Sequence, residues 1–342
     1  MTAAPLDHDR TTIDWFTFTH DDPRALAWCL RGPTEDRKSG INVFRTAVQD
    51  GHGTMLASDG PQPRPHMLIM PGKALEAWRA ERSVRELVQH LATAGVICTR
   101  LDLARDTSGP WTPYRLRDHI ESDRYVSSWM KFTYHLSKGD TGLTVQCGSR
   151  ASTSMLRCYD KKVELEAAGE PCPFDRLSRW EMEIKGKLAR KAFRQLARLR
   201  LLLDEETGVE TWPLRTVHSA WLGHRLRLTT DPVDRDGKNQ AHATTLPEWE
   251  AFLAGSADDI LAPELDERSP ADQAYAPGRW AVKCVSSALA LVHDLGGDDL
   301  VRALIERGRG RRSAKHGLIF QNRAETLPAL QSAIVRERPA AG

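Results

Sequence analysis

Segments in which apolar and polar residues alternate recur along the first half of the chain. In residues 12–19, Ile13 and Trp15 are separated by a polar residue, and so are Phe16 and Phe18. An alternation of period two is the pattern of a strand with one buried face. The same pattern predicts further strands at 66–70, 96–104, 129–136, 143–147, 155–161 and 177–184.

Apolar residues at helical spacing mark several of the segments between these strands. Val84, Leu87 and Leu91 share one helical face, and the helix-capping residue Ser83 precedes them. Helices are therefore predicted at 84–94, 23–30 and 74–82, and from 187 to 203. Because strands and helices mix without a strict βαβ rhythm, we expect an α+β fold: a largely antiparallel sheet with flanking helices, followed by a mainly helical C-terminal region.

Composition narrows the class of protein only slightly. The 342 residues are 40% hydrophobic with a formal net charge of +2, so a nucleic-acid-binding surface, if present, must be local. The six cysteines (29, 98, 147, 158, 172 and 284) show no zinc-ligand spacing and favour a reducing compartment. With no apolar run long enough to cross a bilayer, we expect a cytoplasmic protein without a membrane partner.

One tyrosine, Tyr159, lies among basic residues: Arg150, Arg157, Lys161 and Lys162. A tyrosine hydroxyl has a pKa near 10 and needs local positive charge to become a nucleophilic phenolate. On a strand, side chains of alternate residues share a face, which would place Arg157 and Lys161 beside Tyr159. The alternative is a packed ring whose hydroxyl is hydrogen-bonded, the commoner state of a tyrosine.

Carboxylates occur on two predicted strands. Glu181 and Glu183 share one face of their strand, while Asp102 lies in the sequence Arg100-Leu-Asp-Leu-Ala-Arg-Asp106. Clustered carboxylates favour a hard divalent cation, Mg²⁺ or Mn²⁺. An exposed strand face carrying mixed charges is the alternative, and Asp106 could simply cap a turn.

Basic residues without an acidic neighbour fill the helix predicted after residue 186. At helical spacing they form one stripe: Lys187, Arg190, Lys191, Arg194 and Arg198. Such a stripe is either a solvated face or a surface that contacts phosphates, and its single sign favours the latter. A second basic cluster at 302–315 is interrupted by glycines.

Four segments, taken together, resemble a known family. The sequence GSRASTSMLRCYDKKVE at 148–164, followed by RWEMEIK at 179–185, resembles the signature of rolling-circle replication initiators of the Rep-trans type, a replication initiation factor and relaxase family. Residues 13–18, 66–73 and 99–106 resemble its opening strand, its second strand and its Arg-x-Asp-x-x-x-Asp strand. The resemblance covers about 12–225. The sequence contains no His-hydrophobic-His pair and no GxxxxGK[ST] loop, so another initiator class and a helicase motor are excluded.

The resemblance implies a DNA nicking and joining domain at 12–225. A region at 226–342 would add DNA contacts, with a flexible loop around 256–277, where acidic residues surround Pro263 and Pro270. Tyr159 would attack one strand of an origin, leaving a 5′-phosphotyrosine and a free 3′-hydroxyl primer. The implied residues are: catalytic, Tyr159, Lys161 and Arg157; metal ligands, Asp102, Glu181 and Glu183; DNA contacts, Arg150, Lys162, Lys187, Arg190, Lys191, Arg194 and Arg198.

Partners follow from the same resemblance. Origin DNA, presented as a hairpin or as duplex with a single-stranded nick site, would be the substrate, a host helicase would open the duplex, and a homodimer is compatible with the family. Two alternatives stay open: a conjugative relaxase of the same family, and a DNA-binding control protein that has lost the chemistry.

Overall fold

The computed structural model describes residues 9–37, 41, 44–58, 66–136, 142–203, 210–233, 240, 242–254 and 286–309. The chain divides into two compact units, Met1–Pro263 and Glu264–Gly342. The segment predicted as a flexible loop, 256–277, lies outside the described residues. Of the second unit, one helix is described, α10 (Ser286–Arg309), which Gly297 interrupts with a φ of 63°.

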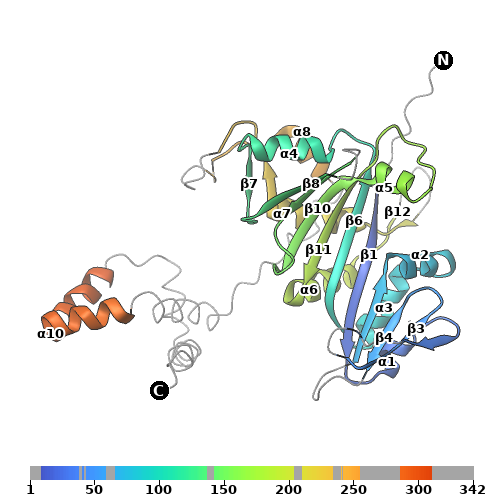
Figure 1. The fold of residues 1–342 in the computed structure, drawn as a ribbon, viewed down its shortest axis with the longest axis horizontal. Coiled ribbons are helices and arrows are strands. Elements are labelled where there is room, and N and C mark those ends of the chain that lie inside the picture. Colours follow the sequence, from blue (N-terminus) through green and yellow to red (C-terminus); the bar gives the residue numbers. More distant parts are fainter. Residues whose placement is uncertain are drawn as a thin grey trace. The chain divides into compact units, whose positions relative to one another are not determined.

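The first unit is built on one ten-stranded sheet whose neighbouring strands are all antiparallel (Figure 1). Its strand order is β2-β3-β4-β5-β1-β6-β11-β10-β9-β8. The strands are β1 (Asp9–His20), β2 (Thr34–Asp36), β3 (Thr46–Asp50), β4 (Met55–Ser58), β5 (His66–Pro71), β6 (Ile97–Thr107), β8 (Phe132–Leu136), β9 (Leu143–Cys147), β10 (Ser154–Asp160) and β11 (Ser178–Lys185). The predicted α+β fold with a largely antiparallel sheet is confirmed.

Helices flank this sheet, and two small sheets complete the unit. The helices are α1 (Arg24–Ala27), α2 (Gly72–Glu81), α3 (Val84–Thr93), α4 (Pro113–Glu121), α5 (Lys161–Ala167), α6 (Gly186–Arg198), α7 (Leu214–Arg225) and α8 (Pro247–Leu253). The small sheets pair β12 (Leu202–Leu203) with β13 (Glu210–Thr211), and β14 (Leu226–Leu228) with β7 (Tyr125–Ser127). Among the described residues, no helix is long and apolar enough to span a membrane.

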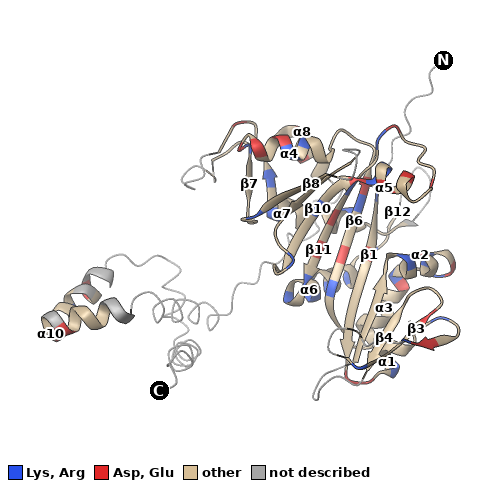
Figure 2. Cartoon of the chain, viewed as in Figure 1, with Lys and Arg blue, Asp and Glu red and all other residues tan. Residues whose placement is uncertain are grey.

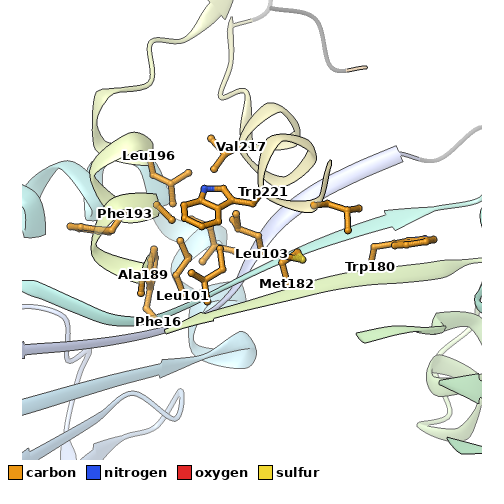
Figure 3. Close-up of a cluster of buried hydrophobic side chains, with 14 of the residues drawn as sticks. Phe16, Leu101, Leu103, Trp180, Met182, Ala189, Phe193, Leu196, Val217 and Trp221 are labelled. Atoms are coloured by element: carbon orange, nitrogen blue, oxygen red, sulfur yellow. The ribbon is translucent and has the colours of Figure 1, made fainter. Parts of the chain in front are cut away.

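The main core lies between the sheet and the helices α6 and α7. Figure 3 shows both helices on the same side of the central strands, with apolar side chains between them. The strands contribute Phe16, Leu101, Leu103, Trp180 and Met182, and the helices contribute Ala189, Phe193, Leu196, Val217 and Trp221, all buried. Trp221 also donates from Nε1 to Gln195 Oε1 over 2.9 Å, which joins α7 to α6.

Packing against the sheet continues beyond residue 225. In α8, Trp249 and Phe252 contact Trp180 with ring centroids 5.5 Å and 5.3 Å apart, and Trp111 donates to the carbonyl of Glu248. These contacts bury aromatic surface, which contributes strongly to core stability. The first unit therefore includes α8, whereas the predicted nicking domain ends at residue 225.

Candidate active site

Antiparallel register brings charged residues of three strands into adjoining rows on one face of the sheet. Tyr159 of β10 lies opposite Arg179 of β11, which lies opposite Asp106 of β6. In the same way Arg157 lies opposite Glu181, and Glu183 lies opposite Asp102. Figure 2 shows acidic and basic residues interleaved on β6 and β11. Because alternate residues such as Trp180 and Met182 pack under α6 and α7, this charged face is the side of the sheet turned away from those helices.

A cleft of about 1160 Å³ opens over this face. The sheet residues that line it include Asp14, Arg100, Asp102, Asp106, Arg157, Tyr159, Arg179 and Glu181, and α2 supplies Gly72, Lys73 and Arg79. Of the tyrosines in the described part of the chain, Tyr159 alone lines the cleft. Its hydroxyl makes no hydrogen bond to any described residue, unlike that of an ordinary packed tyrosine. The oxygen is therefore open to a ligand in the cleft.

The pKa of Tyr159 is raised, where the sequence led us to expect a lowered one. Burial is the main cause, since it disfavours the phenolate, and the charge of Arg179 opposes it. The two bases expected to activate Tyr159 are engaged elsewhere: Arg157 is paired with Glu181, and Lys161 Nζ lies 2.8 Å from Glu164. The basic side chain nearest in register to the phenol is Arg179, which sequence reasoning did not select.

Two carboxylates hold Arg179 in place. It donates from Nε and Nη2 to Asp106 over 2.6 Å and 2.7 Å, and from Nη1 to Asp14 over 3.1 Å. Asp106 thus orients a guanidinium and does not cap a turn. Burial lowers the pKa of Arg179, but these acidic partners outweigh it and the pKa is raised, so this residue stays charged.

Asp14 reaches the cleft through an irregularity in β1. The pairing of β1 with β6 shifts between Ile13 and Trp15, so Asp14 is an extra residue, as in a β-bulge. Bulges are common beside active sites because they re-aim one side chain. Gly72 leaves room for it: a Cβ there would lie 3.2 Å from Asp14 Oδ1. The period-two pattern of residues 12–19 gave no signal of this bulge.

The three predicted metal ligands lie on the charged face of neighbouring strands, and each is paired with a base. Arg100 donates to Asp102 over 2.9 Å and 2.6 Å and lies 2.8 Å from Glu183, Lys185 also pairs with Glu183, and Arg157 pairs with Glu181. The pKa of Asp102 is nevertheless raised to about 7, because burial and the charges of Glu181 and Glu183 outweigh the attraction of Arg100. The exposed mixed-charge strand considered as an alternative is excluded, since Asp102, Glu181 and Glu183 are all buried.

This donor set suits a hard divalent cation in kind, because all three side chains offer carboxylate oxygens. In the arrangement described, however, no three acidic, histidine or cysteine side chains among the described residues are placed to hold a metal ion together. Instead, the guanidinium groups of Arg100 and Arg157 form ion pairs with these carboxylates.

The remaining predicted residues near Tyr159 lie at the margin of the cleft or outside it. Strand β10 ends at Asp160, whose side chain caps α5, so Lys161 begins a helix and does not continue the strand face. Lys161 still lines the cleft, whereas Lys162 Nζ donates to the carbonyl of Asp175. Arg150 is exposed in the loop after Gly148, a residue with a φ of 93° that packs against the ring of Trp129.

The basic stripe lies on α6, away from the Tyr159 face. Lys187, Arg190, Arg194 and Arg198 are exposed, and Lys191 is partly exposed. Opposite the stripe, Phe193 and Leu196 pack onto the core face of the sheet. The helix ends at Arg198, earlier than the predicted 203. The sheet therefore separates these cations from the Tyr159 hydroxyl.

Comparison with known proteins identifies the family. The model of the family described as Replication initiation factor, Rep_trans, matches residues 96–305. The chain belongs to this family. A solved structure, the rolling circle replication initiator protein from Geobacillus stearothermophilus, has a similar fold, with a TM-score of 0.59, 19% sequence identity, and coverage of 72% of this chain and 96% of that chain. A comparison with curated protein sequences finds no significant match.

The resemblance inferred from the sequence motifs is thereby confirmed. The match to the Rep_trans model begins at residue 96, just before β6, and includes β10, β11 and α6. All the predicted site residues of this initiator lie within the matched range. Asp14, Gly72 and Arg79 of the cleft lie outside it and come from the part of the sheet before β6.

Proposed function

We propose that this Rep-trans initiator nicks one DNA strand at an origin with Tyr159 and later rejoins it. The phenol oxygen attacks a phosphodiester phosphorus, a Tyr–O–P bond forms, and the bond from phosphorus to the 3′ oxygen breaks. The phenol proton goes by way of solvent or a base to the departing 3′ oxygen. The products are a 5′-phosphotyrosine and a 3′-hydroxyl that can prime synthesis, and the reverse attack reseals the strand.

One observation carries this proposal: the Tyr159 hydroxyl lies in the charged cleft with no hydrogen-bond partner among the described residues. Because burial raises the pKa of Tyr159, the phenol is neutral before DNA binds, and its proton must leave during attack. Arg179 is the cation placed to stabilise the phenolate as it forms. Asp106 and Asp14 hold its guanidinium, so little reorganisation is needed at that moment.

Asp102 and Glu181, with Glu183 beside Asp102, are the residues that would hold a divalent cation. Such an ion, Mg²⁺ or Mn²⁺, would polarise the scissile phosphate and stabilise its developing charge. Arg100 and Arg157 form ion pairs with Asp102 and Glu181. DNA phosphates entering the cleft would offer these arginines new partners and so release the carboxylates for a cation.

The sequence has no GxxxxGK[ST] loop, the nucleotide-binding loop of a helicase motor. In this proposal another protein therefore separates the strands beyond the nick. A host helicase is the partner we propose for it. A homodimer stays a prediction.

A nicking assay tests the proposal. Purified protein is incubated with supercoiled plasmid carrying its own gene region and Mg²⁺, and we expect open circles with protein attached covalently. Tyr159→Phe should abolish both while DNA binding stays within a few-fold, because only the nucleophilic oxygen is lost. The matched control is Tyr134→Phe, since Tyr134 is 38% exposed and lies outside the cleft; it should nick like wild type. A Tyr159→Phe protein that still forms the adduct contradicts the proposal.

A further inference from the structure

A smaller groove of about 410 Å³ continues from the Tyr159 cleft past the edge of β1. The two spaces share Arg10, Thr12 and Arg79 as lining residues. Strand β5 pairs with β1 only from Trp15 onward, so the edge of β1 before Trp15 is not covered by that strand. The groove runs along this edge toward the start of α3 and toward Trp212, just ahead of α7.

Three arginines meet at this groove without carboxylate partners. Arg10, Arg79 and Arg85 form no ion pair with any residue that the structure describes, and Glu86 is the one acidic residue that lines the groove. Arg79 Nη1 donates to the carbonyl of Ile13 over 3.1 Å. Burial lowers the pKa of Arg79, and so do the charges of Arg10 and Arg179, whereas the charges of Glu76 and Asp14 raise it. An anion in the groove would offset the positive charge that Arg10 and Arg85 add beside Arg79.

A larger pocket of about 960 Å³ around Trp28 differs from this groove in its charges. Its lining holds Arg31, Arg37 and Arg82 against four acids, Glu35, Asp36, Asp50 and Glu81. Arg31, for example, pairs with Glu81. Acids outnumber arginines in that pocket, whereas three arginines and one acid line the groove next to the Tyr159 cleft. The excess of positive charge is thus a local property of the groove.

Polar atoms without partners and an apolar wall complete the groove. Thr11 Oγ1, Arg85 Nε and Trp212 Nε1 are buried and have no hydrogen-bond partner within the described residues. Such groups are costly to leave unpaired, and all three belong to residues that line the groove. Beside them, Val84 and the ring of Trp212 offer apolar surface.

We propose that this groove binds an unpaired nucleotide of the DNA strand next to the scissile phosphate, an inference that rests on the proposed nicking function. The strand's phosphates contact Arg10, Arg79 and Arg85, and a base packs against Trp212. Phosphate contacts combined with base stacking on an aromatic ring are the usual features of single-strand binding. A base inside a duplex is already stacked on its neighbours, so the apolar wall fits an unpaired one.

Binding of a fluorescent twelve-nucleotide oligothymidine, measured by anisotropy at three salt concentrations, tests the inference. All variants carry Tyr159→Phe, so the result does not depend on whether that residue is the nucleophile. Arg10→Gln with Arg85→Gln should weaken binding about tenfold or more, since two charged contacts are lost. The slope of log affinity against log salt should become shallower by about 1.4, at about 0.7 per single-strand phosphate. Trp212→Leu should weaken binding without changing the slope.

The matched control is Arg45→Gln with Arg82→Gln, which removes two exposed arginines outside the groove. It should bind the oligonucleotide like the parent, and thermal unfolding of each variant checks that it folds. An unchanged affinity of the Arg10/Arg85 variant overturns the inference, as does an equal loss of affinity for duplex of the same length. Inorganic phosphate could also stabilise the parent protein against thermal unfolding. If the Arg10/Arg85 variant loses this stabilisation but binds the oligonucleotide as before, the groove is a small-anion site and the inference is overturned. The nicking proposal is tested separately, by whether the wild-type protein forms the covalent adduct.

Discussion

At the scale of one residue, Asp102 shows that burying an ionisable group in the site lowers the stability of the folded protein. Its side chain is buried and its pKa is about 7, although a carboxylate of this kind ordinarily titrates near 3.8. The folded protein therefore keeps this proton up to neutral pH, whereas the unfolded chain loses it near pH 4. Stability should fall as pH rises from about 4 to about 7, since the unfolded state ionises first.

Asp102→Asn should accordingly raise the thermal unfolding temperature at pH 8 in metal-free buffer by a few degrees. The amide carries no charge to bury, and Arg100 keeps Glu183 as a partner at 2.8 Å. The gain should shrink toward pH 5, where wild-type Asp102 is neutral as well. Calorimetry at both values checks this. A lower unfolding temperature at pH 8 would show that the Arg100–Asp102 pair outweighs the cost of burying the carboxylate.

The same carboxylates are the proposed ligands of the divalent cation. Asp102→Ala and Glu181→Ala should each reduce metal-dependent cleavage by roughly a hundredfold or more, the scale of removing a preorganised electrostatic group. Both variants should also lose the Mn²⁺-induced rise in unfolding temperature that we expect of the wild type. Full cleavage in the presence of EDTA would contradict the metal assignment.

Side-chain identities were more predictable than their pairings at this scale. Tyr159, Glu181 and Asp102 could be selected from the sequence because the Rep-trans resemblance includes the segments that hold them, and alternation along a strand assigns each a face. The pairing of Arg179 with Tyr159 depends on cross-strand register, which alternation within one strand does not fix. Asp14 depends on a bulge, and no local pattern announced it.

Helix α6 is the element whose role the fold alters most. Its basic stripe is exposed as expected, yet the sheet separates it from Tyr159, so it should set affinity for flanking duplex and not chemistry. Replacing Lys187, Arg190, Arg194 and Arg198 with alanine should make the salt slope of duplex binding shallower by about three to four units, at about 0.9 per phosphate. Nicking should largely recover at protein concentrations well above the new dissociation constant.

The control for α6 removes four exposed cations elsewhere in the unit, Arg24, Arg45, Arg82 and Lys131. Net charge then changes equally in both proteins, and only the α6 variant should lose slope. An unchanged slope would mean that the stripe is a solvated face.

Element types were predicted better than element ends. Ser83 caps α3 by accepting from Glu86 N, and β9 has the predicted bounds. By contrast, β10 ends one residue early, because Asp160 accepts from Val163 N and starts α5. A short capping sequence overrode the alternation there. Strand β4, only four residues long, is not among the predicted strands; it lies in a segment rich in glycine and proline.

For the whole molecule, the cleft belongs entirely to the first of the two units. All residues that line it lie between Arg10 and Glu181. We therefore expect a fragment of residues 1–263 to fold by itself and to form the covalent adduct on single-stranded origin DNA at a rate within a few-fold of the full chain. Loss of the adduct in a well-folded fragment would show that 264–342 contributes to the site.

At this scale the sequence predicted the fold class and the family, but not where the first unit ends. The α+β class follows from the mixture of strand and helix patterns. The contacts of Trp249 and Phe252 with Trp180 join segments about 70 residues apart, and no periodicity reports such packing.

The central claim is that the Tyr159 oxygen becomes bonded to DNA. The most direct measurement digests the adduct formed with Mg²⁺ using nuclease and protease, then sequences the nucleotide-bearing peptide by mass spectrometry. The account predicts a single modified peptide from β10, with a 5′-phosphate on Tyr159. A nucleotide attached to Tyr114, Tyr125, Tyr134 or Tyr275, or to a residue that is not tyrosine, would contradict it.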